Sequence, residues 1–120
     1  MIDVADLIGI PYKEKGRSKE EGFDCYGLAI EVMKRTGHIL PDVEYTDYST
    51  ELADEYASLF PIVQTNLAGE GVILEIRSKD SLHIGVCLDS KTFIHATKNQ
   101  GVRISLIKNV PVKRMYKWES

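Results

Sequence analysis

The feature that most constrains the fold is a change of sequence periodicity after Gly71. From there on, the chain contains short runs rich in β-branched, aromatic and aliphatic residues, separated by short polar connections. Such connections cannot hold the crossover helix that joins two parallel strands, so the strands must be antiparallel. We expect strands at residues 72–77, 82–88, 92–97, 101–107 and 112–118.

The first half of the chain has helical patterns instead. Apolar residues recur at helical spacing in residues 24–36, where Asp24 is a candidate cap and Gly37 follows the last turn. A second helix is expected at residues 49–60 and a short one at residues 3–8. Helices followed by a strand meander predict an α+β fold, with the helices packed on one face of an antiparallel sheet of about five strands.

Length and composition are those of one globular domain, so residues 1–120 are treated as a single unit. No apolar run approaches the roughly 20 residues of a membrane span. The N-terminus is acidic where a secretory signal is basic, which predicts cytoplasmic synthesis without a signal peptide. The two cysteines cannot form a disulfide framework.

Charge is distributed unevenly along the chain. The formal net charge of −3 combines −9 over residues 1–90 with +6 over residues 91–120. The basic region either faces an anionic polymer or forms the solvent-exposed faces of strands, and we favour the second interpretation. Because the chain is acidic overall and has no recognised nucleic-acid-binding motif, we expect no nucleic-acid partner.

Cys25 stands at the expected first turn of the helix that Asp24 caps. Unpaired backbone N–H groups and the helix dipole favour a thiolate there, and the same N–H groups can donate to an oxyanion. A nucleophile also needs a basic partner. The alternative is a buried structural thiol, because free cysteine is among the most buried residue types.

The candidate partners of Cys25 are histidines. His38 follows the helix at its far end and is expected to be a turn or surface residue. His83 and His95 lie on adjacent expected strands; a turn centred on Ser90 would place them on one face, whereas a two-residue turn would place them on opposite faces. On one face, His83 would be the base and His95 would orient it. The alternative for each histidine is a hydrogen-bonded residue of a half-buried strand.

Two further residues lie on the strand of His83. Cys87 is expected to be a core residue, because it would lie about 13 Å from His83 along the strand. Gly85 is expected to leave space for a substrate or for the end of the helix to approach closely.

Three segments together resemble a known family. The sequences "GFDCYGLA", "LHIGVCL" and "FIHA" are similar, in that order, to the three motifs of the NlpC-type cell-wall cysteine peptidases, which have a papain-like α+β fold. Further similar segments make the resemblance cover nearly the whole chain; they are residues 9–17, 38–42 and 101–107.

The resemblance implies a cysteine endopeptidase that cleaves peptidoglycan stem peptides, typically between γ-D-glutamate and a diamino acid, through an acyl-enzyme. The matching positions are Cys25 as nucleophile, His83 as base and His95 as the third polar residue. Tyr12 matches a tyrosine beside the nucleophile, and Asp24 matches a position that helps to hold the substrate amine. No metal or other cofactor is expected.

Two departures from the family pattern concern specificity and setting. Tyr26 stands where many members have a serine that contributes to substrate binding, and Glu70-Gly71 replaces a familiar Gly-Asp pair. The aromatic residue after the cysteine, the "GIPY" start and the short domain are similar to the branch found in phage and prophage tails. The expected partners are therefore a peptidoglycan stem peptide and tail proteins, with the protein in a virion and acting at the bacterial wall.

Three alternatives remain at this point. The first is a tail assembly protein that uses the papain-like groove for binding, and the second is a related thiol amidase or acyltransferase. The third alternative is a zinc site formed by Cys25, His83 and His95, which lacks the paired local spacing usual in zinc sites.

Overall fold

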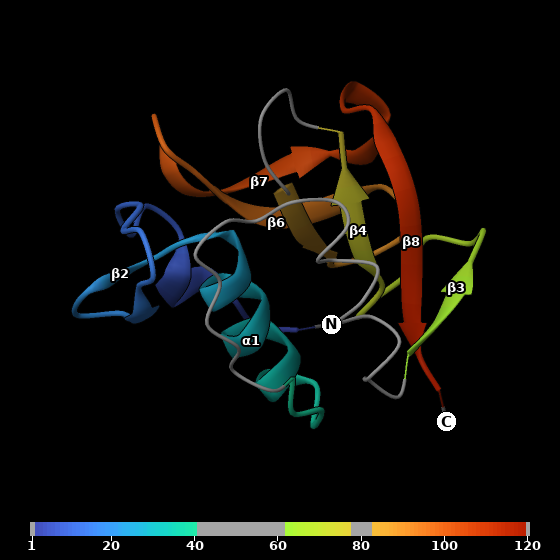
Figure 1. Ribbon diagram of the computed structural model, residues 1–120, viewed down its shortest axis with the longest axis horizontal. Helices are drawn as coiled ribbons and strands as arrows, with labels where there is room; N and C mark the ends of the chain where they lie inside the picture. Colours follow the sequence, from blue (N-terminus) through green and yellow to red (C-terminus); the bar gives the residue numbers. More distant parts are fainter. Residues whose placement is uncertain (1, 41–61, 78–82, 120) are drawn as a thin grey trace.

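The computed structural model describes residues 2–40, 62–77 and 83–119. Within them, an α-helix packs against a large antiparallel sheet, so the α+β prediction is confirmed (Figure 1). The helix expected at residues 49–60 lies outside the described residues. The helix expected at residues 3–8 is reduced to a 3₁₀ turn, η1 (Ala5–Leu7), because the chain reaches the Gly9 turn immediately afterwards.

Helix α1 (Cys25–Arg35) begins and ends within one residue of its predicted bounds. Its first turn is capped by Asp24, whose side chain accepts a hydrogen bond from the Gly27 backbone N–H at 2.6 Å. At the other end, Gly37 has φ +88°, the left-handed conformation that commonly follows a helix. The capping signals in the sequence therefore located this helix correctly.

The main sheet has six strands in the described part of the chain, one more than expected, and every pairing is antiparallel. All five predicted strands are present. The additional strand, β3, has the short sequence "IVQT" with little alternation, which is why the pattern missed it. The strands are β3 (Ile62–Thr65), β4 (Ile73–Ile76), β5 (His83–Cys87), β6 (Thr92–Thr97), β7 (Gly101–Leu106) and β8 (Val112–Trp118).

The strand order is β3-β8-β4-β5-β6-β7, so the expected simple meander is wrong for its last strand. The backbone of Val102 in β7 exchanges hydrogen bonds with Gly9 and Ile10, each at 2.9 Å, and these residues occupy part of the outer edge of β7. After the 3₁₀ turn η2 (Ile107–Asn109), β8 pairs with β3 and β4 instead.

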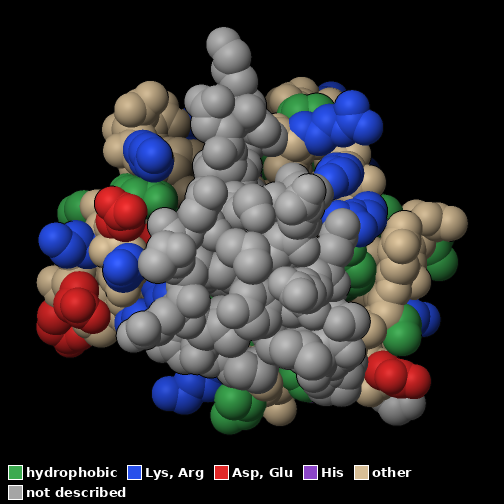
Figure 2. Space-filling view, viewed as in Figure 1, with side chains coloured by type: hydrophobic (Ala, Val, Ile, Leu, Met, Phe, Trp, Pro, Cys, Tyr) green, Lys and Arg blue, Asp and Glu red, His purple; other side chains and the backbone are tan. Residues whose placement is uncertain are grey.

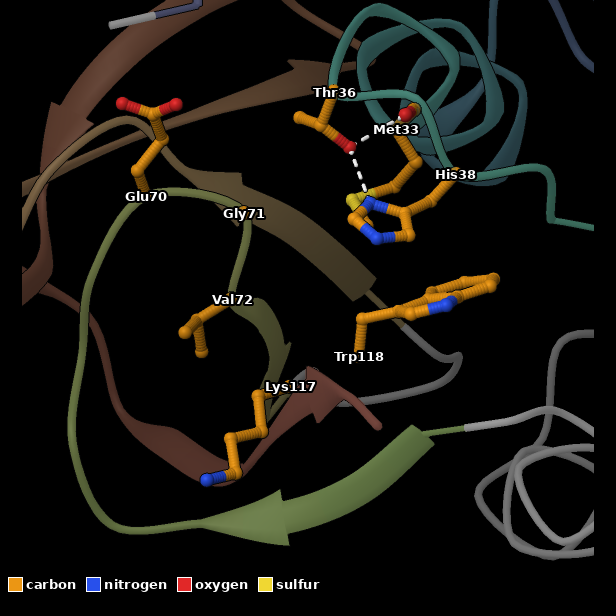
Figure 3. A pocket seen from close by; sticks show the side chains of 8 residues that line it. All are labelled: Met33, Thr36, His38, Glu70, Gly71, Val72, Lys117 and Trp118. Atoms are coloured by element: carbon orange, nitrogen blue, oxygen red, sulfur yellow. Dashed lines mark hydrogen bonds between the residues drawn. The ribbon is translucent and has the colours of Figure 1, made fainter. Parts of the chain in front are cut away.

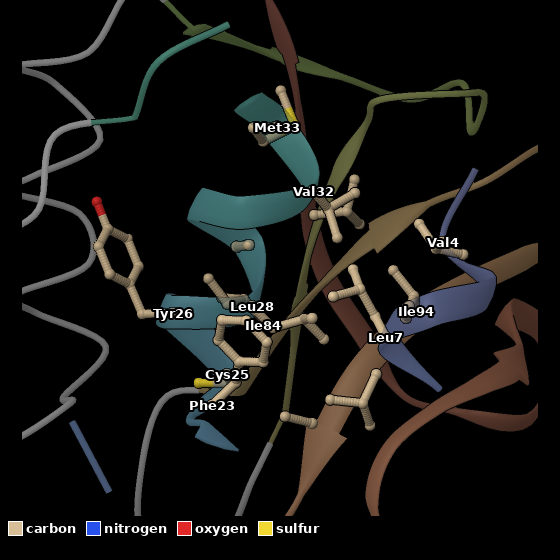
Figure 4. Close-up of a cluster of buried hydrophobic side chains, with 14 of the residues drawn as sticks. Val4, Leu7, Phe23, Cys25, Tyr26, Leu28, Val32, Met33, Ile84 and Ile94 are labelled. Carbon is tan, nitrogen blue, oxygen red and sulfur yellow. The ribbon is translucent and has the colours of Figure 1, made fainter. Parts of the chain in front are cut away.

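Buried side chains cover both faces of the sheet. On one face α1 packs against β5 and β6, and Leu28 of the helix belongs to one buried cluster with Ile84 and Ile94 of the strands (Figure 4). On the other face Cys87 and Phe93 belong to a second cluster. Because strand side chains alternate between faces, His83 and His95 lie on the face of Cys87 and Phe93.

A small hairpin holds the chain before α1. Its strands, β1 (Arg17–Ser18) and β2 (Gly22–Phe23), pair antiparallel, and Tyr12 forms a bridge with Phe23. The hairpin therefore brings Tyr12 and Arg17 to the beginning of the helix that carries Cys25.

Candidate active site

The register of β5 and β6 brings the two histidines together. Val86 is opposite Ile94, and the Leu88 backbone N–H donates to the Thr92 carbonyl at 2.9 Å, so the turn centres on Ser90. His83 Nε2 lies 2.8 Å from His95 Nδ1. His83 and His95 therefore lie on one face of the sheet, as expected for a turn centred on Ser90.

The side chain of Asp89 holds this turn. Its Oδ1 accepts hydrogen bonds from the backbone N–H groups of Lys91 and Thr92 at 2.8 and 2.7 Å, and from the Thr92 hydroxyl at 3.0 Å. These bonds lower the pKa of Asp89. An aspartate that bonds to backbone N–H groups two and three residues later is a recognisable turn signal, so the register has a local cause.

His95 contacts a residue that the sequence interpretation missed. His95 Nε2 lies 2.8 Å from Ser105 Oγ on β7. In the β6–β7 pairing Arg103 is opposite His95, and Ser105 is the diagonal neighbour on the same face. The tight turn at residues 97–101 would have allowed this register to be predicted, but no motif marks Ser105.

The thiol of Cys25 lies at the head of α1 and at the start of β5. The backbone N–H groups of Ile84, Tyr26 and Cys25 itself lower its pKa, but burial is the larger effect and raises the pKa of the thiol to about 11. The N–H groups at the helix head favour the thiolate as expected, but the loss of solvent outweighs them, so the thiol keeps its proton at neutral pH. A separate base is needed to remove the proton.

The two histidines are suited to that task. Burial lowers the pKa of His83. Burial, together with the charges of His83 and Arg103, lowers the pKa of His95 to about 4. Both rings are therefore neutral at neutral pH, and a neutral imidazole can accept a proton from a thiol.

Tyr12 lies close enough to the thiol for their charges to interact. Burial and the negative charges of Cys25, Asp24 and Glu14 raise the pKa of Tyr12 to about 12. The phenol therefore keeps its proton at neutral pH and is a hydrogen-bond donor beside the thiol.

Asp24 and Tyr26 are enclosed by the protein. The Asp24 carboxylate has no exposed surface; Oδ1 accepts from Arg17 Nη1 at 2.9 Å in addition to the cap bond, and Oδ2 accepts from the Lys15 backbone N–H at 3.1 Å. Tyr26 is 4% exposed, and the guanidinium of Arg17 lies 5.8 Å from its ring centroid. In Figure 4 its side chain points away from Leu28. These contacts fix the conformation of the helix head.

The remaining candidates lie away from the thiol or act in packing. Cys87 is fully buried in the second core cluster, as predicted, and burial raises its pKa to about 11. A Cβ on Gly85 would lie 2.6 Å from Phe93 Cδ2. Gly85 therefore makes room for the Phe93 ring, and the expectation that it leaves space for a substrate or the helix end is corrected. The ring of Phe93 in turn lies 4.5 Å from that of His95.

His38 belongs to a separate pocket at the far end of α1. Its Nδ1 lies 2.9 Å from Thr36 Oγ1 and its ring lies 4.6 Å from that of Trp118 (Figure 3). The pocket has a volume of about 320 Å³. It is about 12–16 Å along the helix from Cys25, so it is distinct from the candidate site. It is lined by Met33, Thr36, His38, Glu70, Gly71, Val72, Lys117 and Trp118.

Some basic side chains of the C-terminal region form ion pairs. Figure 2 shows Lys and Arg side chains gathered over the upper part of β8. Arg114 Nε lies 2.8 Å from Glu75 Oε1, and Lys113 Nζ lies 3.8 Å from Glu75 Oε2. Among the described residues, no group of three His, Cys, Asp or Glu side chains is arranged to hold a metal ion.

Comparison with known families agrees with this geometry. The NlpC/P60 family model matches residues 9–118. The chain belongs to the NlpC/P60 family. The family part of the resemblance is thereby confirmed, whereas the assignment to the phage-tail branch stays a prediction.

Two solved structures have the same fold as this NlpC/P60 chain. The NlpC/P60 domain of the peptidoglycan hydrolase SagA has a TM-score of 0.65 and 21% identity, over 92% of this chain and 88% of that one. A Staphylococcus aureus Mu50 protein described as similar to a lipoprotein of the NLP/P60 family has a TM-score of 0.65 and 20% identity. That match covers 93% of this chain but only 37% of the staphylococcal one.

The curated proteins contain no match to this chain. None of the helices in residues 2–40, 62–77 and 83–119 combines the length and the apolar character needed to cross a bilayer.

Proposed function

We propose that this NlpC/P60 protein is a cysteine endopeptidase that hydrolyses peptidoglycan stem peptides between γ-D-glutamate and the following diamino acid. The observation that carries the proposal is the 2.8 Å contact between His83 Nε2 and His95 Nδ1. The backbone N–H of Ile84, the residue after His83, bonds to the Cys25 thiol and so brings the start of β5 to the helix head. Family membership and the fold shared with the domain of a peptidoglycan hydrolase support a wall substrate.

The proposed reaction begins with proton transfer. His83 takes the proton of the Cys25 thiol, and the sulfur forms a bond to the carbonyl carbon of the scissile amide. Backbone N–H groups at the head of α1 and the Tyr12 hydroxyl donate to the oxygen that becomes negative. The imidazolium of His83 then gives its proton to the leaving amine, and water releases the acyl group from sulfur.

Substrate preference is proposed to differ from that of family members with a serine after the cysteine. Tyr12 contacts the substrate directly in this proposal. The carboxylate of Asp24 is occupied by Arg17 and the helix cap, so we assign its part in substrate binding to ordering the helix head. Tyr26 replaces the serine and shapes the same side of the site.

A phage or prophage tail is the proposed setting. The support comes from sequence alone: Tyr26 after the nucleophile and the "GIPY" segment of residues 9–12. In this setting the protein would open the wall locally, with tail proteins as its partners.

The test is mass spectrometry of purified stem peptides that end in diaminopimelate or in lysine, after incubation with the wild type and with Cys25→Ala. We expect a new fragment that ends in γ-D-glutamate with the wild type and none with the variant. Cys87→Ala is the matched control, because it removes the other thiol and is expected to retain cleavage.

Other outcomes distinguish the alternatives. Absence of any fragment while Cys25 is still alkylated would favour an amidase or acyltransferase with another acyl substrate. Absence of a fragment together with an unreactive Cys25 would favour a tail assembly protein.

A further inference from the structure

The hydrogen-bonded chain that starts at His83 extends beyond His95. His83 on β5, His95 on β6 and Ser105 on β7 are linked by two contacts of 2.8 Å, and these use both ring nitrogens of His95. His95 is only 6% exposed, whereas Ser105 is half-buried. Ser105 therefore links the buried His95 ring to solvent, while His83 at the other end of the chain is itself half-buried.

Proton positions along this chain are coupled. A neutral imidazole carries one ring proton, so it donates at one nitrogen and accepts at the other. If His83 donates from Nε2, His95 accepts at Nδ1 and carries its own proton at Nε2, where Ser105 Oγ is the acceptor. If Ser105 donates to His95 Nε2 instead, His95 donates from Nδ1 and the proton of His83 must lie on its Nδ1.

The two arrangements differ in whether His83 can act as a base. Its Nδ1 is the nitrogen that the His95 contact leaves available for the Cys25 thiol. In the first arrangement Nδ1 has a lone pair and can accept the thiol proton. In the second arrangement Nδ1 already carries a proton, and attack by the thiol would lack a base.

We propose that Ser105 is a positioning residue for the hydrolysis: by accepting a hydrogen bond from His95 Nε2, it holds both histidines in the tautomers that leave His83 Nδ1 free. Being half-buried, its hydroxyl can donate to water while its oxygen accepts from the ring. The inference rests on the proposed function, because it assigns His83 the part of base.

The charges around His95 are compatible with a single ring proton. Arg103 is directly opposite His95 in the sheet, and its positive charge disfavours a doubly protonated ring. His83 acts on His95 in the same direction. The Phe93 ring on the same face is uncharged. At neutral pH each ring therefore carries one proton, and the tautomer of one histidine determines that of the other.

The test uses Ser105→Ala, Ser105→Thr and the control Ser90→Ala, which removes a hydroxyl from the exposed β5–β6 turn. Three quantities are measured on the full chain: kcat and KM for stem-peptide hydrolysis, ring ¹⁵N chemical shifts of the histidines, and the alkylation rate of Cys25 by iodoacetamide, located by peptide mapping.

We expect Ser105→Ala to lower kcat about tenfold with KM unchanged, well below the roughly 10⁴-fold effect of removing a group that orients a catalytic base directly. The ¹⁵N shifts should show proton density moving from His95 Nε2 to Nδ1, and Cys25 alkylation should slow. Ser105→Thr retains the acceptor oxygen and should restore all three quantities, and Ser90→Ala should change none.

Failure of this inference is distinguishable from failure of the proposed function. Wild-type kcat and unchanged ¹⁵N shifts in Ser105→Ala would overturn the inference, as would an equal loss in Ser105→Thr. If the wild type cleaves no stem peptide but Ser105→Ala still shifts the tautomers and slows alkylation, the inference stands and the proposed substrate is wrong.

Discussion

Replacement of Asp24 by alanine is expected to destabilise the protein more than any other single change at the helix head. The carboxylate is fully buried and accepts hydrogen bonds from Arg17 Nη1, from the Gly27 backbone N–H and from the Lys15 backbone N–H. Its removal leaves these donors without this acceptor and removes the helix cap.

The size of the expected loss of stability follows from the burial of the ion pair between Asp24 and Arg17. Removing one partner of a buried ion pair costs about 3–5 kcal/mol, and loss of a helix cap alone costs about 1 kcal/mol. The Arg17 side chain is 22% exposed, so water can solvate part of its charge after the substitution. We therefore expect a loss near the lower limit, about 3 kcal/mol, which is a large part of the 5–15 kcal/mol stability of an ordinary domain.

Urea unfolding followed by the fluorescence of Trp118, the single tryptophan, measures this loss. Asp24→Asn retains an oxygen that can accept the cap bond and should lose about half as much. The control is Asp3→Ala, which removes an exposed carboxylate that accepts a local bond from the Ala5 backbone N–H at 3.2 Å. An Asp24→Ala protein within 0.5 kcal/mol of the wild type, about the size of an ordinary surface substitution, would refute the reasoning.

Two further predictions concern the histidine pair. The pKa of His95 is about 4 in the folded protein against 6.5 for an ordinary histidine, so the unfolded chain binds more protons between these values. The contribution of His95 to the free energy of unfolding is therefore present above pH 6.5 and is lost as the pH falls to 4, by at most about 3 kcal/mol. Urea unfolding of the wild type across this pH range measures the loss. A His95→Gln variant whose stability falls with the same pH slope would contradict the prediction. Gly85→Ala should cost about 1–3 kcal/mol and reduce activity, because the new methyl group displaces the Phe93 ring that packs on His95. Gly69→Ala is the matched control, since no atom in the described part of the chain lies within 4 Å of its added Cβ, and equal losses in the two variants would refute the packing argument.

Local signals in the sequence located the elements that carry the candidate site. The helix of Cys25 was placed by the Asp24 cap and the glycine after its last turn, both of which act within a few residues. The choice between two registers for His83 and His95 was made by Asp89, which holds the turn by bonds to residues two and three positions later. Such short-range hydrogen bonds are the reason why these features were accessible from sequence.

Features that depend on distant segments were not accessible in this way. Strand β8 pairs with β4 rather than with β7. Part of the outer edge of β7 is occupied by Gly9 and Ile10, which lie more than 90 residues earlier in the sequence. The role of Gly85 depends on the Phe93 ring of the neighbouring strand rather than on an approaching substrate. In both cases the partner is set by packing, which periodicity does not describe.

The sequence by itself determined the α+β class, the antiparallel pairing and which residues belong to the family motifs, because caps, turns and alternation are local properties of the chain. Only the tertiary structure decided the protonation of the site. Burial of Cys25 raises its pKa although backbone N–H groups at the helix head favour the thiolate, and burial lowers the pKa of His95. Exclusion of solvent arises from the packing of the whole fold, and no short segment of the sequence carries that information.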